Sequence, residues 1–96
     1  MAYNIIKRNT PEQNQFKTIS DFKDCISRGG EVNFEWKGVQ YWIIRYGKDN
    51  KITIYMPHNP DTEVAFNTSD DALEYMVGTD RLRDVITQVS VLDRTI

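Results

Sequence analysis

The clearest pattern in the chain is a strict alternation of apolar and polar side chains in its middle third. Over residues 31–36 every second side chain is apolar or aromatic, which is typical of a strand with one buried face. Lys37 and Gly38 can form a two-residue turn, and residues 39–46 then run back as a second strand. Such a turn fixes the register, which pairs Trp36 with Val39, Phe34 with Tyr41 and Val32 with Ile43.

A third strand is predicted over residues 51–56, after a turn at residues 47–50. Its parity places Ile52, Ile54 and Met56 on the same buried face as the first two strands, and Thr53 and Tyr55 on the other face. The prolines in residues 57–61 predict a surface loop, and residues 63–66 can add a short fourth strand.

Helical spacing of apolar residues occurs on both sides of these strands. Residues 19–28 are predicted to form a helix that begins at Thr18 or Ser20 and ends at Gly29-Gly30. Further along, Thr68 starts a second predicted helix that Gly78 ends, and Thr79 starts a third. The apolar faces of these two helices are Leu73, Met76 and Val77, and then Leu82, Val85, Ile86 and Val89.

The order α-β-β-β-(β)-α-α predicts an α+β fold with an antiparallel three- to four-stranded sheet and helices on one face. A chain of 96 residues has material for one hydrophobic core, so we expect a single domain over residues 17–96. Residues 7–17 contain one apolar side chain, Phe16, and are predicted to be a linker. Residues 1–16 are therefore expected to be a flexible or docking N-terminal segment.

The stretch from Gly30 to Ile43 resembles a pattern found in small proteins of Gram-positive bacteria and their phages, G-x-E-[IV]-x-F-x-[WY]-x-G-x-x-Y-x-I. The helix before this stretch, which ends in Gly-Gly, and the acid-capped helix after it are similar too, so the resemblance covers roughly residues 18–90. It implies a phage or prophage setting, in which small acidic proteins bind and block a host protein, for example a defence component such as a CRISPR effector. It implies no catalytic residues.

Charge and composition narrow the functional classes. The formal net charge of -2 removes the broad attraction to phosphate or anionic lipid that a basic protein has. No apolar run approaches the roughly 20 residues of a membrane span, and residues 1–8 lack the apolar stretch of a secretion signal. With a single cysteine, Cys25, no internal disulfide can form, so we expect a cytoplasmic protein.

Candidate catalytic and metal-binding residues are few. His58 and Cys25 are the chain's only histidine and cysteine; we interpret His58 as a solvated turn residue and Cys25 as a small buried hydrophobe. Glu31 and Glu35 share a sheet face but stand about 13–14 Å apart, too far for one reaction centre. Phosphate-binding glycine motifs do not occur. We therefore expect no enzyme activity, no metal and no cofactor.

The second face of the predicted sheet is more informative. The register gathers aromatic, aliphatic and acidic side chains there, and Trp42 stands across from Tyr55. Exposed aromatic surface is typical of interaction sites, and Trp and Tyr dominate binding energies. The predicted partner-binding residues are Trp42, Tyr55, Tyr46, Ile44, Glu31 and Glu35. Their acidic edge and aromatic centre favour a basic protein surface as partner.

Three alternatives for this face remain open from the sequence. It can be covered by the chain's own apolar residues, it can form a homodimer, or it can bind a host protein. The residues available to cover it are Tyr3, Ile5, Ile6, Phe16, Val91 and Leu92.

A second function class is nucleic-acid binding, because α-β-β-β-α is also the element order of double-stranded-RNA-binding domains. Residues 68–71, where such domains carry a basic cluster, read Thr-Ser-Asp-Asp and would repel phosphate. Mimicry of nucleic acid by the acidic residues between Asp61 and Glu74 is a variant of the protein-binding hypothesis.

Overall fold

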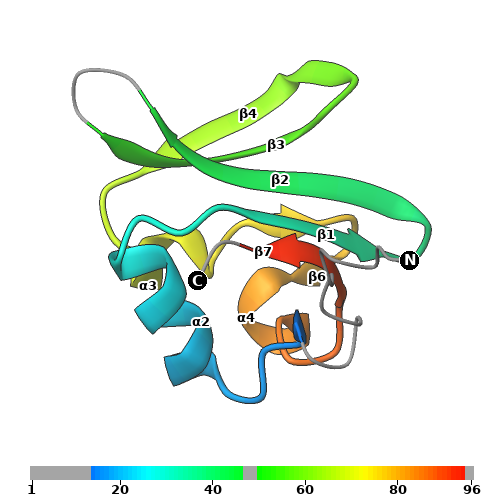
Figure 1. Cartoon of the computed structure of the whole chain (residues 1–96). Helices are drawn as coiled ribbons and strands as arrows, with labels where there is room; N and C mark the ends of the chain where they lie inside the picture. Colours follow the sequence, from blue (N-terminus) through cyan, green and yellow to red (C-terminus); the bar gives the residue numbers. More distant parts are fainter. Residues whose placement is uncertain (1–13, 47–49, 95–96) are drawn as a thin grey trace, which may run out of the picture.

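The computed structural model of the chain describes residues 14–46 and 50–94. Five strands form one antiparallel sheet in the order β4-β3-β2-β1-β7, and the described helices lie on one side of it (Figure 1). The α+β class is confirmed, and the sheet has five strands rather than the three or four predicted. The strands are β1 (Val32–Trp36), β2 (Val39–Tyr46), β3 (Lys51–Met56), β4 (Asn59–Phe66) and β7 (Ser90–Arg94). The remaining elements are α2 (Ile19–Ser27), α3 (Ser69–Ala72), α4 (Leu82–Val85) and a small hairpin of β5 (Met76–Val77) and β6 (Asp80–Arg81).

The first helix, α2, has the predicted caps. The Thr18 hydroxyl accepts a hydrogen bond from the Asp21 N–H at 3.0 Å, and the Asp21 carboxylate in turn accepts one from the Lys17 N–H. At the other end Gly29 has a φ of +86°, and the N–H of Gly30 donates to the Cys25 carbonyl at 2.9 Å. These bonds satisfy backbone groups at both ends, so a helix of nine residues is well defined.

The first hairpin has the register that the alternation predicts. Lys37 and Gly38 both have positive φ angles, 53° and 82°, as a two-residue turn between twisted strands requires. The observed pairs include Trp36 with Val39, Phe34 with Tyr41 and Val32 with Ile43. The pairing of β2 with β3 also follows the predicted parity, with Trp42 opposite Tyr55. Ile52 and Ile54 are fully buried, whereas Met56 is half-buried at the end of the core.

The fourth strand is longer than predicted, and the prediction of a surface loop at residues 57–61 is wrong. Pro57 and His58 form a tight turn, and β4 begins at Asn59. A register shift between Ile54 and Met56 accommodates the turn, and the Thr62 hydroxyl accepts a hydrogen bond from the Met56 N–H at 2.8 Å. Pro60 is tolerated because β4 lies at the sheet edge, where a missing N–H removes no ladder bond.

The two C-terminal helices are much shorter than predicted. Thr68 caps α3 as expected, but the chain leaves the helix after Ala72, and Met76–Val77 pairs with Asp80–Arg81 around Gly78. Thr79 therefore lies in a hairpin turn rather than at a helix start, and Arg81 precedes α4. The helical spacing nevertheless identified core positions. All the predicted stripe residues except Met76 are buried, namely Leu73, Val77, Leu82, Val85, Ile86 and Val89.

Two residues that the sequence analysis did not place in the core, Phe16 and Val91, belong to it. Phe16 is fully buried and makes an edge-to-face contact with Phe22, and the Gln15 side chain donates a hydrogen bond to the Thr87 carbonyl. The predicted linker over residues 7–17 is therefore wrong for the part the structure describes. Val91, in the unpredicted strand β7, is fully buried and pairs with Phe34 of β1.

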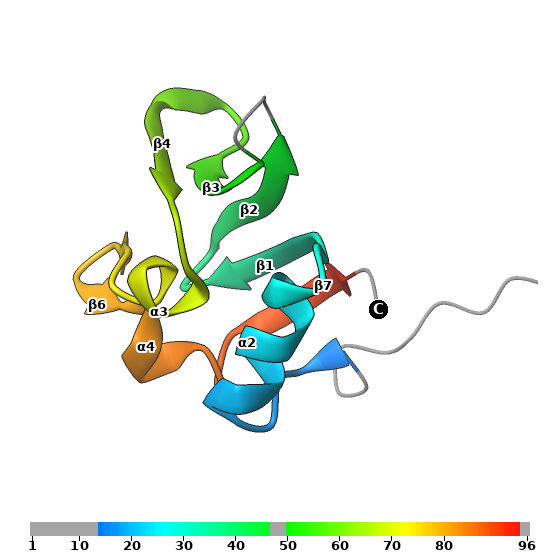
Figure 2. The ribbon, with the colours of Figure 1, turned by 90° about the vertical axis from the view of Figure 1, so that its left-hand side faces the viewer.

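The sheet is strongly curved. Figure 2 shows β2, β3 and β4 rising away from the β1–β7 pair, while α2, α3 and α4 gather below that pair. The core lies between the helices and the concealed sheet face, whose buried residues are Val32, Phe34, Tyr41, Ile43, Ile52, Ile54 and Val91. The opposite surface of the sheet, which we call the outer face, carries the predicted partner-binding residues.

Candidate functional site

Three of the predicted binding residues form the centre of the outer face. Trp42 lies between Asn33 of β1 and Tyr55 of β3, and Ile44 lies opposite Thr53. Residues paired across antiparallel strands point to the same side, so these side chains share one surface. Tyr46 pairs with Lys51 through its backbone, and its side chain lies outside the described part of the structure.

The centre of the outer face is more closely packed than the sequence suggests. Trp42, Ile44 and Tyr55 are each half-buried, and Thr53 between them is only 3% exposed although it faces away from the helices. The aromatic surface is thus held in place by its neighbours. A side chain that is already ordered loses less entropy when a partner covers it.

Several residues that were candidates to cover the outer face are located elsewhere. Phe16 and Val91 belong to the core on the opposite side of the sheet, so these two residues do not cover the outer face. Leu92 lies in edge strand β7 and is 40% exposed. Tyr3, Ile5 and Ile6 lie outside the described residues.

The acidic edge of the outer face contains one residue that the sequence did not suggest. Asp93 pairs with Asn33 across β1 and β7 and therefore joins Glu31 and Glu35 on this surface. Among the described residues, none lies within ion-pair distance of these three carboxylates. On the helix side, by contrast, Asp21 meets Arg94 and Asp70 meets Lys23. The three outer-face carboxylates thus differ from Asp21 and Asp70, which are paired with cations.

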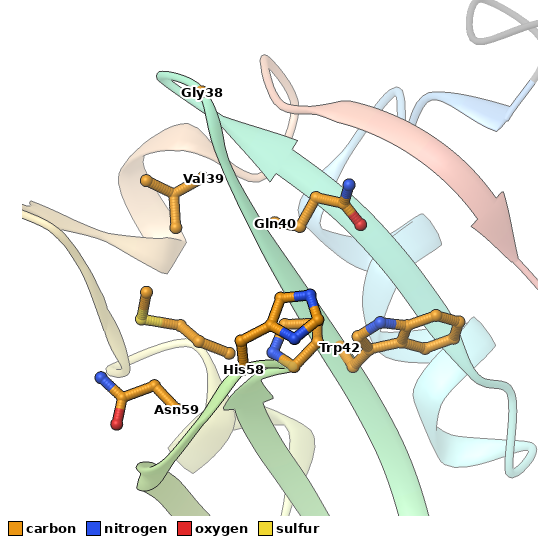
Figure 3. A pocket seen from close by; sticks show the side chains of 8 residues that line it. Gly38, Val39, Gln40, Trp42, His58 and Asn59 are labelled. Atoms are coloured by element: carbon orange, nitrogen blue, oxygen red, sulfur yellow. The ribbon is translucent and has the colours of Figure 1, made fainter.

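A pocket opens beyond the last β2–β3 pair, Trp42 with Tyr55, between the start of β2 and the β3–β4 turn. Gln40 and Trp42 line it from the outer face, and Val39 and Met56 line it from the core side. Its volume is about 500 Å³. Figure 3 shows that Val39 points to one side of β2, whereas Gln40 and Trp42 point to the other; His58 and Asn59 come from the β3–β4 turn and the start of β4. The lining residues are Gly38, Val39, Gln40, Trp42, Met56, Pro57, His58 and Asn59.

The strand ladder is interrupted at this pocket. Trp36 and Val39 flank the two-residue turn and form a hydrogen-bonded pair, so the backbone groups of every even-numbered residue of β2 face β3. The observed β2–β3 pairs begin at Trp42 with Tyr55. Continued two residues beyond that pair, the same register would put Pro57 opposite Gln40. Because proline has no N–H, the Gln40 carbonyl receives no ladder hydrogen bond from β3.

No Asp, Glu, Lys or Arg side chain is among the residues that line the pocket. Trp42, Val39, Met56 and Pro57 supply apolar surface, while the polar groups are the side-chain amides of Gln40 and Asn59 and the His58 imidazole. The sequence prediction missed this pocket because it treated residues 57–61 as a loop. The sequence signal that could have indicated the pocket is the β2–β3 register: continued to Pro57, it meets a residue that cannot donate a ladder hydrogen bond.

The interpretations of the single histidine and the single cysteine can be compared with their surroundings. His58 lines the pocket, and no group of three or more His, Cys, Asp or Glu side chains in the described ranges could hold a metal ion. Cys25 is 3% exposed, and burial raises the pKa of its thiol, an effect that Arg94 and Arg28 partly oppose. The interpretation of Cys25 as a small buried hydrophobe is confirmed.

Within residues 14–46 and 50–94, the helices are too short and too polar to cross a lipid bilayer.

Comparison of the chain with models of known protein families, with curated proteins and with solved structures finds no match.

Proposed function

We propose that this protein is a small binding module that holds a basic surface of a partner protein against its outer face. The observation that carries the proposal is the set of carboxylates Glu31, Glu35 and Asp93, which have no ion-pair partner among the described residues and share a sheet face with Trp42 and Tyr55. Central aromatic side chains such as Trp and Tyr are the residues that most often carry a large share of a binding energy.

Each part of this surface has a distinct role in the proposal. The carboxylates speed encounter with a basic partner and set its orientation, because opposite potentials steer association. Trp42 and Tyr55 then supply apolar contact area, and their ordered packing limits the entropy lost on binding.

The proposal also includes the setting that the sequence resemblance implies, in which a phage-derived or prophage-derived protein inhibits or regulates a host protein. A protein partner is favoured over nucleic acid because the three carboxylates would repel phosphate from the outer face. The N-terminus of α3, with Asp70 and Asp71, would repel it too.

Affinity capture from a Gram-positive host lysate, followed by calorimetry with the purified partner, tests the proposal. Trp42→Ala with Tyr55→Ala should weaken binding at least about 30-fold, the change produced by losing one strong contact of about 2 kcal/mol. Glu31→Lys with Glu35→Lys should weaken it as well, and wild-type affinity should fall as salt is raised.

A matched pair of variants controls for net charge. Asp24→Lys with Asp84→Lys changes the charge equally, but these exposed residues lie in α2 and α4 on the helix side. The control should bind like wild type. Equal loss in both charge-reversal pairs, or no loss in the alanine pair, would refute the proposal. Light scattering distinguishes the homodimer, since self-association through this face would appear as a doubled mass that the alanine pair abolishes.

A further inference from the structure

The pocket at the end of the outer face is continuous with the proposed binding surface. Trp42 lines the pocket and also pairs with Tyr55 at the centre of the face. Glu35 stands directly across β1 and β2 from Gln40, so a carboxylate borders the pocket mouth. A partner lying on the outer face would therefore meet the pocket and an acidic group together.

The pocket offers one backbone acceptor that the fold leaves without a ladder donor. The β2–β3 pairs end at Trp42 with Tyr55, and the residue that would follow opposite Gln40 is Pro57, which cannot donate to the Gln40 carbonyl. β2 is an inner strand, but its side toward β3 is unpaired before Trp42. An unpaired side of a strand is where an extended peptide can attach, with its own N–H completing the ladder.

The walls determine which side chain would enter. They contain no Asp, Glu, Lys or Arg side chain, and Trp42, Val39, Met56 and Pro57 give them mostly apolar surface. The volume of about 500 Å³ falls within the range of about 300–1,000 Å³ found for ligand pockets. An apolar or aromatic side chain suits this space better than a charged one, because a buried charge would have no counter-charge on the walls.

We propose that the pocket anchors an extended peptide segment of the partner by one apolar or aromatic side chain, with a basic residue beside the anchor. The peptide N–H donates to the Gln40 carbonyl, and the basic side chain pairs with Glu35. This inference rests on the proposed function and specifies the partner as a chain that presents a short basic and apolar motif in extended form.

Nuclear magnetic resonance titration of the full-length ¹⁵N-labelled chain with capped tripeptides tests this inference. The probe is N-acetyl-Lys-Leu-Lys-amide. It should cause saturable shifts of the Trp42 indole N–H and of the Tyr41 amide, which shares a peptide group with the Gln40 carbonyl. Saturation is expected with a Kd on the order of 1 mM, the scale of a single anchored side chain.

Two control peptides separate the anchor from the charge. N-acetyl-Lys-Gly-Lys-amide has the same charge without the anchor, and N-acetyl-Glu-Leu-Glu-amide has the anchor with opposite charge. Both should bind at least several-fold more weakly. The inference is overturned if the glycine peptide produces equal shifts, or if the leucine peptide gives no saturable shift at Trp42 and Tyr41 up to about 10 mM.

Protein variants assign the contacts. Glu35→Gln should weaken the Lys-Leu-Lys peptide about 2- to 5-fold, the scale of one exposed ion pair, whereas Asp24→Asn on the helix side should not. Trp42→Ala should abolish saturation while the dispersed amide spectrum shows that the fold is retained.

The two proposals can fail separately. If the tripeptides do not bind but a partner still depends on Glu31 and Tyr55, the anchor inference is wrong and the proposed function stands. If the tripeptides bind as expected but no partner depends on Glu31 or Tyr55, the pocket is a peptide site and the proposed function of the outer face is wrong.

Discussion

Replacing Phe16 with alanine tests whether the segment before α2 is part of the folded core. The Phe16 ring is 0% exposed, meets the Phe22 ring edge-to-face at 5.3 Å between centroids, and lies 4.5 Å from the Arg94 guanidinium carbon. Removing a buried phenylalanine costs about 3–5 kcal/mol, and an aromatic pair contributes about 0.5–1.5 kcal/mol beyond buried area. We therefore expect Phe16→Ala to lower the free energy of unfolding by about 4 kcal/mol.

This loss is large against the stability of a domain of this size, about 5–14 kcal/mol at the usual value per residue. Urea unfolding followed by tryptophan fluorescence should show the midpoint falling by about 2 M at a slope of about 2 kcal/mol per M. Phe66→Ala is the matched control, because Phe66 is only half-buried and its contact with Tyr75 is longer, 6.3 Å between centroids. A loss below about 1 kcal/mol for Phe16→Ala would refute the reasoning and restore a linker before α2.

Three further predictions concern single residues. Hydrogen bonds from Trp36, and to a smaller extent from Lys37, lower the pKa of Asp80, so folding stabilises the ionised carboxylate. Asp80→Asn should therefore reduce stability to urea at pH 7. The difference in stability from wild type should shrink as pH falls below about 3.9. A difference that stays constant down to about pH 2 would contradict this assignment. Gly38→Ala should lower the free energy of unfolding in urea by about 1 kcal/mol, because φ is +82° at this position. An added Cβ would meet no atom within 4 Å, so backbone strain alone accounts for the loss. An unchanged free energy of unfolding would mean that the turn changes type. Burial raises the pKa of the Cys25 thiol, so a disulfide reagent should modify it slowly in the folded protein and rapidly in urea, and equal rates would show that the thiol is exposed.

The parts of the fold that could be predicted depend on residues close together in the sequence. The hairpin of β1 and β2 is specified by period-two alternation and by a turn whose length fixes the register, so Trp36, Val39 and their neighbours could be paired in advance. The same parity placed Trp42 opposite Tyr55. Local patterns thus supplied the centre of the candidate site.

The parts that could not be predicted depend on contacts between distant segments. Strand β7 contributes one fully buried apolar side chain, Val91, and its pairing with β1 carries no local signal. The spacing from Leu73 to Val89 fits a helix, but the turn at Gly78 lets short elements bury nearly the same residues. The position of Asp93 on the outer face was missed for the same reason, since a residue on an unpredicted strand cannot be assigned to a face.

The position of β1 between β2 and β7 has a consequence for the order of folding. The hairpins from β1 to β4 join neighbouring segments, whereas Val32 of β1 pairs with Arg94 near the opposite end of the described chain. Closing so long a loop costs entropy before any contact repays it, so the β1–β7 pairing is expected to form late. A nascent chain on the ribosome would carry β1 with one open edge until Arg94 emerges. During that interval the edge can pair with other chains, which makes yield in cells sensitive to the rate of synthesis and to chaperones.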